Sequence, residues 1–218
     1  MELKGKKINF LGDSITEGYG ASSKENRYTD IIERESGAIC RNYGISGTRI
    51  ARQHIENNGV PENSDFCSRV YTMDPDADIV CVFGGTNDFG HGDAGIGDFS
   101  DRTPDTFCGA LNVLYSSLIE RFPQARIVIL TPLHRTGENE PSGTAGTEPK
   151  TATLKEYVDL IKKAAEYYSL PVLDLFSVSG MQPTVPVIKE KYVPDGLHPN
   201  DAGHARLAQI ITAFLSGL

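Results

Sequence analysis

One serine near the start of the sequence has neighbours suited to a nucleophile. Ser14 belongs to the tetrapeptide G-D-S-I at positions 12–15, directly after the apolar run Ile8–Leu11. If this run is a strand, the Ser14 hydroxyl projects at its carboxyl end, where the Ser14 N–H can face a developing negative charge. A serine that only caps the next helix would show the same local pattern, so the segment has two interpretations.

A carboxylate and an imidazole stand close together near the other end of the chain. Asp195 and His198 are three residues apart in the segment D-G-L-H-P-N, and Pro199 follows directly. A single turn at this spacing can place the carboxylate against one ring nitrogen and leave the other nitrogen to take a proton. Solvated Asp and His residues are common, so the pair is more informative than either residue by itself.

Two further segments could donate hydrogen bonds to an anion. The segment N-Y-G-I-S-G-T at positions 42–48 contains glycines, which let a backbone N–H come close to a ligand. The segment G-G-T-N-D at positions 84–88 offers the side-chain N–H of Asn87. Ordinary turns also use Gly and Asn, so both segments have a purely structural alternative.

The strands that must position these residues follow from short apolar runs. The third and fourth runs are continuous and β-branched, which is typical of strands that are covered on both faces. The five predicted strands are Ile8–Leu11, Ala38–Tyr43, Asp78–Phe83, Arg126–Thr131 and Pro171–Phe176.

Helical periodicity separates the predicted strands. Four helices are expected: one from Tyr28 to Glu35 that stops at Gly37, one carrying Phe107, Leu111, Leu114 and Leu118, one carrying Leu154, Val158, Ile161 and Ala165, and a last one after Asn200. Repeated βα units predict a parallel sheet with helices on both faces, whose ligands bind at the carboxyl ends of the strands. Two long loops, Phe89–Pro104 and Arg135–Thr151, are expected to be functional or mobile.

The four segments, in their order along the chain, resemble the four sequence blocks of the SGNH hydrolases, also called the GDSL lipase/esterase family. The resemblance extends from Gly12 to Asn200. It implies that Ser14 is the nucleophile, that His198 is its base and that Asp195 orients the imidazole. It also implies that Gly47 and Asn87 join the Ser14 amide in an oxyanion hole. The implied fold is a flavodoxin-like three-layer α/β/α sandwich with a five-stranded parallel sheet.

The resemblance implies an ester hydrolase. The polar, glycine-rich loops near the predicted site favour a small-molecule carboxylic ester with a short acyl or acetyl group, for instance on a carbohydrate. A thioesterase or a lysophospholipase on the same fold is an alternative. A flavodoxin-like module that binds phosphate or a carbohydrate without catalysis is a third, from a different functional class.

Several other residues are candidates with weaker support. Asp13, His91 and His134 could line the substrate site, although His91 could equally be a solvated loop residue. Asp13 and Asp88 are expected to brace their loops through backbone hydrogen bonds. His54 and His204 are expected to be structural or exposed. Because no cluster has metal-ligand spacing, we expect neither a catalytic metal nor a cofactor.

Composition limits the other possibilities. The chain has 218 residues, which suits a single domain over residues 1–218, and a formal net charge of −8 without a basic run, which argues against nucleic acid as a partner. No apolar stretch has the length of a membrane span, and no secretory signal is evident, so we expect a cytoplasmic protein. The four scattered cysteines are expected to be reduced and mostly buried. The sequence leaves the oligomeric state open.

Overall fold

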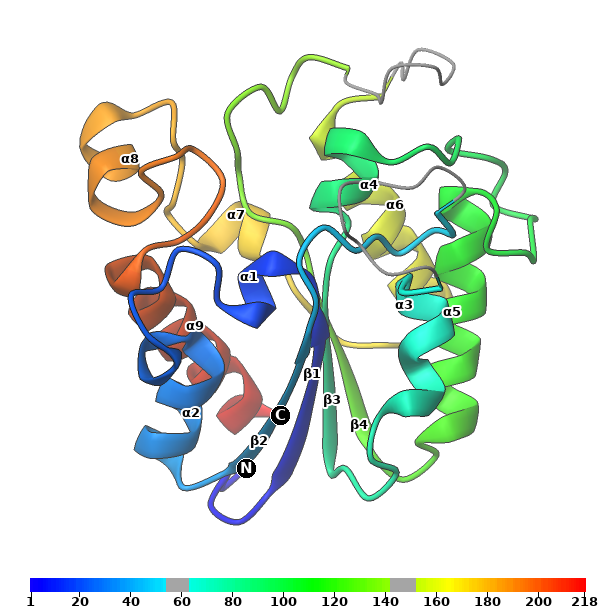
Figure 1. Ribbon diagram of the computed structural model, residues 1–218. Coiled ribbons are helices and arrows are strands. Elements are labelled where there is room, and N and C mark those ends of the chain that lie inside the picture. The colour runs from blue at the N-terminus through cyan, green and yellow to red at the C-terminus, as the bar shows by residue number, and fades with distance from the viewer. Residues whose placement is uncertain (54–62, 142–151) are drawn as a thin grey trace.

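The computed structural model describes residues 1–53, 63–141 and 152–218, and its core is a sheet of five parallel strands (Figure 1). The order across the sheet is β2-β1-β3-β4-β5, so the strand order reverses between the neighbouring strands β1 and β3. In such a sheet the ligand site is expected where the strand order reverses. The strands are β1 (Lys7–Gly12), β2 (Ile39–Gly44), β3 (Ile79–Phe83), β4 (Arg126–Leu130) and β5 (Val172–Leu173).

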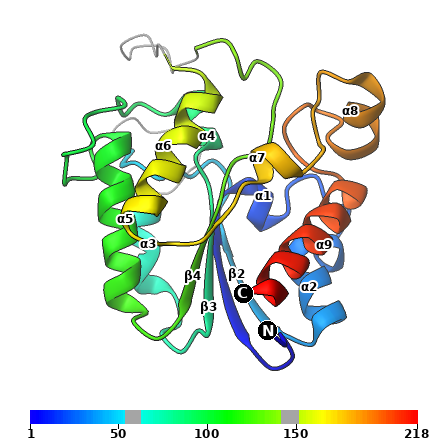
Figure 2. The same ribbon diagram turned by 180° about the vertical axis from the view of Figure 1, so that it is seen from behind.

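Helices cover both faces of the sheet and complete a flavodoxin-like three-layer α/β/α sandwich. Helices α2 and α9 lie on one face, and α3, α5 and α6 lie on the other (Figures 1 and 2). The α-helices are α1 (Ser14–Glu17), α2 (Tyr28–Ser36), α3 (Phe66–Arg69), α4 (Thr86–His91), α5 (Phe107–Arg121), α6 (Leu154–Tyr167), α7 (Leu175–Val178), α8 (Pro186–Tyr192) and α9 (Asp201–Gly217), and short 3₁₀ turns span Lys24–Asn26 and Val70–Thr72.

Alternate side chains of the central strands enter two separate cores. In β3, Val80 and Val82 pack toward α5 and α6, whereas Ile79, Cys81 and Phe83 pack with the residues of α2 and α9. All five residues are buried, as expected for a strand with a helix layer on each side. The prediction that this strand and β4 are covered on both faces is confirmed.

The strand register aligns the carboxyl ends of the first three strands. Gly12 at the end of β1 is opposite Gly44 of β2 on one side and Phe83 of β3 on the other. Phe83 is in turn opposite Leu130 at the end of β4. The loops that follow these strands therefore start from one edge of the sheet, which brings together segments that are far apart in the sequence.

The four predicted helices are present as α2, α5, α6 and α9. Gly37 ends α2 in a left-handed conformation, and the side chain of Asn200 caps α9 by accepting a hydrogen bond from Gly203 N–H. Helix α6 begins with a capping box between Thr153 and Glu156. The end of α2 at Gly37 and the start of α9 after Asn200 agree with the sequence prediction.

The prediction of a fifth strand from Pro171 to Phe176 was wrong in length. Only Val172 and Leu173 form a strand, and the next residue, Asp174, caps α7 by accepting a hydrogen bond from Ser177 N–H. The Asp174 carboxylate also accepts a hydrogen bond from the Thr131 hydroxyl at 3.0 Å, which links the end of β5 to the end of β4. An apolar run with a capping aspartate in its middle is thus divided between a strand and a helix.

The long loop predicted from Phe89 starts later than expected, because α4 extends to His91. Of the second long loop, residues 142–151 lie outside the described residues, as does His54. The four cysteines are free and three of them are buried, as predicted. In the described ranges, no helix combines the length and the apolar character that crossing a membrane requires.

Candidate active site

Ser14 is the first residue of a one-turn helix that starts directly after β1. The preceding residue, Asp13, is the helix cap, and its Oδ1 accepts a hydrogen bond from Ile15 N–H at 3.0 Å. The interpretation of Ser14 as the helix cap is therefore wrong. Since Asp13 caps the helix, the Ser14 hydroxyl is not needed for capping.

Two hydrogen bonds connect Ser14, His198 and Asp195. The Ser14 Oγ lies 3.1 Å from His198 Nε2, although the two residues are 184 positions apart in the sequence. His198 Nδ1 lies 2.6 Å from Asp195 Oδ2. If Nδ1 carries the proton and donates it to the carboxylate, Nε2 is free to accept the hydroxyl proton of the serine.

The Asp195 carboxylate is held by its own turn. Its Oδ1 accepts hydrogen bonds from the backbone N–H groups of Leu197 and His198, at 2.8 and 2.7 Å. Burial alone would raise the pKa of Asp195, but the hydrogen bonds from His198 and Leu197 outweigh burial and hold this pKa below its usual value. A charged carboxylate thus faces the imidazole, as the three-residue spacing predicted.

Asn87 lies on α4 at the end of β3, beside the loop that contains Gly47. Its Nδ2 donates one hydrogen bond to the Thr48 carbonyl at 3.0 Å, and its Oδ1 is 3.1 Å from His91 Nε2. An amide nitrogen has two protons, so the second one remains for another acceptor. Gly85 allows this placement, because it caps α4 with a φ of 106°, which other residues rarely adopt.

The loop after β2 is attached to the rest of the site from two sides. The Asp88 carboxylate accepts the backbone N–H groups of Ile50 and Ala51, both at 2.9 Å, as predicted for a bracing residue. On the other side, the Glu17 carboxylate accepts the Ser46 N–H at 2.6 Å. The residue between these anchors, Gly47, has a φ of 77°. Within the part of the chain that the structure describes, no protein acceptor takes the backbone N–H of Gly47.

The histidines outside the triad have different environments. His134 follows β4 and its Nδ1 is 2.9 Å from both carboxylate oxygens of Glu138, while its ring packs on Phe176 at 3.7 Å between centroids. His91 contacts Asn87, which places it beside the site. His204 is fully buried and its Nδ1 accepts the Tyr28 N–H at 3.3 Å, so its role is structural, as predicted.

Asp13 lies beneath the site more than beside it. Asp13 is only 1% exposed, so almost none of its surface could line a substrate pocket. Burial raises its pKa to about 7, although the Ile15 N–H and the Arg69 charge oppose this effect. Asp13 therefore braces the start of α1, which agrees with the structural alternative.

Two residues of the site were not found from the sequence. The Tyr19 ring is 59% exposed and lies 4.4 Å from the His198 ring between centroids. The buried Arg69 donates hydrogen bonds to several of the loops described above. Neither belongs to one of the four segments, and no local pattern marks an aromatic or a basic residue that meets its partners only in the folded chain.

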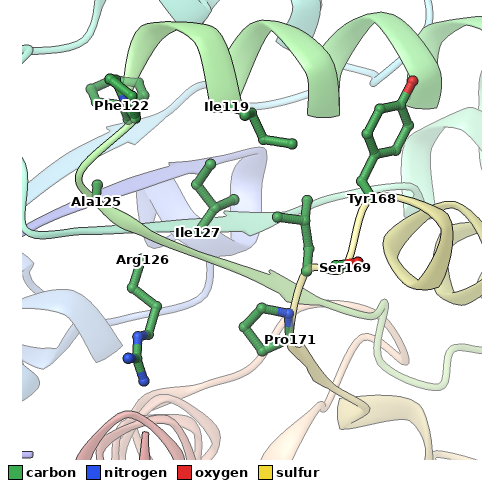
Figure 3. A pocket seen from close by; sticks show the side chains of 10 residues that line it. Ile119, Phe122, Ala125, Arg126, Ile127, Tyr168, Ser169 and Pro171 are labelled. Carbon is green, nitrogen blue, oxygen red and sulfur yellow. The ribbon is translucent and has the colours of Figure 1, made fainter.

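A cavity of about 370 Å³ lies at the opposite edge of the sheet, at the start of β4 and before β5 (Figure 3). Ile119, Phe122, Arg126 and Tyr168 are among the residues that line it. Because strands β4 and β5 run away from this edge, the cavity is separate from the Ser14 site.

The fold is a three-layer α/β sandwich of the SGNH hydrolase type, and the comparison with family models identifies the family. The model of the GDSL-like Lipase/Acylhydrolase family matches residues 10–206, so the chain belongs to this family. A comparison with curated proteins gives no match.

Solved structures resemble the whole chain. A crystal structure of a protein from Lactobacillus plantarum is 30% identical, with a TM-score of 0.82 and 98% of each chain covered. Another crystal structure is 33% identical, with a TM-score of 0.84, and the match covers 100% of this chain and 99% of the other. The lipase/acylhydrolase from Enterococcus faecalis is 22% identical, with a TM-score of 0.67 over 97% of this chain and 96% of its own, which supports the fold alone.

Proposed function

We propose that the chain is a serine esterase that cleaves small carboxylic esters, with short acyl or acetyl groups, through an acyl-enzyme. The observation that carries the proposal is the unbroken contact from Ser14 Oγ to His198 Nε2 and from His198 Nδ1 to Asp195 Oδ2. A serine hydroxyl is a weak nucleophile until an adjacent base takes its proton, and this arrangement provides such a base.

In the proposed reaction, Ser14 Oγ attacks the ester carbonyl while His198 Nε2 takes the hydroxyl proton. The charged Asp195 stabilises the imidazolium that forms. The resulting oxyanion accepts hydrogen bonds from the N–H groups of Ser14 and Gly47 and from Asn87 Nδ2, and a single donor of this kind typically contributes a factor of about 10²–10³ to turnover. His198 then gives the proton to the leaving alcohol, and water cleaves the acyl-enzyme by the same steps in reverse.

The preference for small acyl groups rests on the loops around Ser14. The segments after β1, β2 and β3 contain mainly glycine and polar residues, at positions 18–24, 44–48 and 84–88. A lipase for long acyl chains would present a larger apolar surface beside the nucleophile. Acetyl groups on a carbohydrate are one substrate class with the proposed size and polarity.

A series of 4-nitrophenyl esters with increasing acyl length tests both parts of the proposal. We expect faster turnover of the acetate than of the decanoate, and a loss by a factor on the order of 10⁴ or more in Ser14→Ala, with an unchanged circular dichroism spectrum. Faster turnover of the decanoate would contradict the small-ester substrate. Preferred turnover of acyl-CoA or lysophospholipids in a parallel assay would favour the thioesterase or the lysophospholipase alternative.

A further inference from the structure

Arg69 is a buried arginine whose hydrogen-bond partners are all neutral. It ends α3, is 6% exposed, and lies over the Phe66 ring with its guanidinium carbon 4.8 Å from the ring centroid. Burial lowers the pKa of Arg69 to about 10, which still leaves it charged at neutral pH. The nearby charge of Asp13 opposes this lowering. Burying a cation destabilises the folded state unless its N–H groups donate hydrogen bonds. The acceptors that Arg69 contacts therefore indicate its role.

The acceptors of Arg69 belong to separate segments of the site. Its Nη2 donates to the Gly12 carbonyl at 3.1 Å and to the Thr48 Oγ1 at 2.8 Å. Its Nη1 donates to the Tyr43 carbonyl at 2.7 Å, and its Nε to the Ser64 carbonyl at 2.8 Å. One planar group thus connects the end of β1, the end of β2 and the loop that follows β2.

These contacts lie one or two residues from the groups proposed for catalysis. Gly12 is two residues before Ser14, and Thr48 directly follows Gly47. The Thr48 carbonyl accepts the hydrogen bond from Asn87 Nδ2. Arg69 therefore contacts residues that are next to, or one residue away from, Gly47 and Ser14. It also contacts Thr48, whose carbonyl accepts the hydrogen bond from Asn87.

We propose that Arg69 is a positioning residue, which fixes the segments carrying Ser14, Gly47 and Asn87 relative to one another before substrate binds. This inference rests on the proposed function, because it concerns the geometry of the oxyanion hole. Preorganised donors stabilise a developing charge without reorganisation during the reaction. A displacement of about 1 Å in such a group can cost on the order of 10²-fold in rate.

Arginine is suited to this task in a way that lysine is not. The guanidinium presents five N–H donors in a rigid plane, and the four contacts above use donors on all three nitrogens. A lysine has one nitrogen at the end of a flexible chain, so it cannot reach the Gly12, Tyr43 and Ser64 carbonyls together. Arg69→Lys keeps the positive charge but removes the planar group that makes these four hydrogen bonds.

The first test compares Arg69→Lys and Thr48→Val with the wild type in 4-nitrophenyl acetate hydrolysis, with rates normalised to the folded fraction. We expect kcat to fall by about 10- to 100-fold in Arg69→Lys and by less in Thr48→Val, with KM changed by less than about threefold. The core variant Leu111→Ala is the matched control, since it should lower stability and leave kcat unchanged. If both Arg69→Lys and Thr48→Val fold and keep kcat within about twofold of the wild type, the proposal is overturned.

A second measurement does not depend on ester hydrolysis. Amide hydrogen exchange of residues 12–16 and 44–50 should be faster in Arg69→Lys than in the wild type. In Leu111→Ala, exchange in these two segments should not increase more than exchange in the rest of the protein. Unchanged exchange in both segments would contradict a positioning role. If the wild type did not hydrolyse the ester at all, the proposed function would fail, while this exchange experiment would still decide whether Arg69 fixes the loops.

Discussion

Asp13 and Asp195 are carboxylates at the same edge of the sheet, and their surroundings move their pKa values in opposite directions. Burial raises the pKa of Asp13 to about 7. Asp195 is more exposed, and the hydrogen bonds from its own turn overcome its partial burial and lower its pKa. The charged residue is the one in contact with His198. For the buried Asp13, removal from water disfavours the charged carboxylate and so favours the protonated form.

We expect Asp13→Asn to change how stability depends on pH. Because the folded-state pKa of about 7 lies above the ordinary value of 3.8, the folded state binds the Asp13 proton more tightly than the unfolded state does. This contribution to the free energy of unfolding is complete below pH ~4 and is lost as the pH rises through ~7. Asparagine resembles the neutral acid and keeps an oxygen for the Ile15 N–H.

Urea unfolding of both proteins between about pH 5 and pH 8 measures this difference. The stability of the wild type should decrease relative to that of Asp13→Asn as the pH rises. A difference between the two proteins that does not change with pH would show that Asp13 has no raised pKa.

The sequence singled out Ser14, Asp195 and His198, and also the bracing residue Asp88, but not every residue that supports them. Asp195 and His198 could be paired because three residues separate them, and a single turn is enough to join their side chains. Arg69 could not be found, since its partners are backbone carbonyls and a hydroxyl that come together only when β1 and β2 align. Its burial depends on tertiary packing, which has no local sequence pattern.

The same distinction between local and tertiary information applies to the helices and strands. Helices α5 and α9 were predicted from the apolar spacing within the segments themselves. The strand β5 was predicted too long, because the Asp174 side chain ends it by capping α7. Each element also contributes to stability through its buried face, most clearly in α5, where Leu111 is fully buried.

We expect Leu111→Ala to lower the free energy of unfolding by about 2–5 kcal/mol, because the variant leaves a cavity between α5 and the sheet. The control is Glu120→Ala, an exposed position on the same helix, which should change stability by less than about 0.5 kcal/mol. Chemical denaturation of the three proteins provides the comparison. Equal stability of the two variants would contradict the described core.

At the scale of the whole molecule, the parallel sheet brings the two ends of the chain together at one site. Ser14 lies after the first strand and His198 lies before the last helix, yet their side chains meet at 3.1 Å. The register of β1, β2 and β3 adds the Gly47 and Asn87 segments to the same edge. Each of the four segments had a purely structural alternative when taken alone. The fold places all four at one edge of the sheet, where they can act together.

We propose that the contacts with His198 and Asp195 make Ser14 a reactive nucleophile, which a fluorophosphonate should label covalently. We expect one label per chain on the peptide that contains Ser14, no label in Ser14→Ala, and slower labelling in His198→Ala, as shown by mass spectrometry of the folded proteins. Labelling of a different residue, or none in the folded wild type, would contradict the claim.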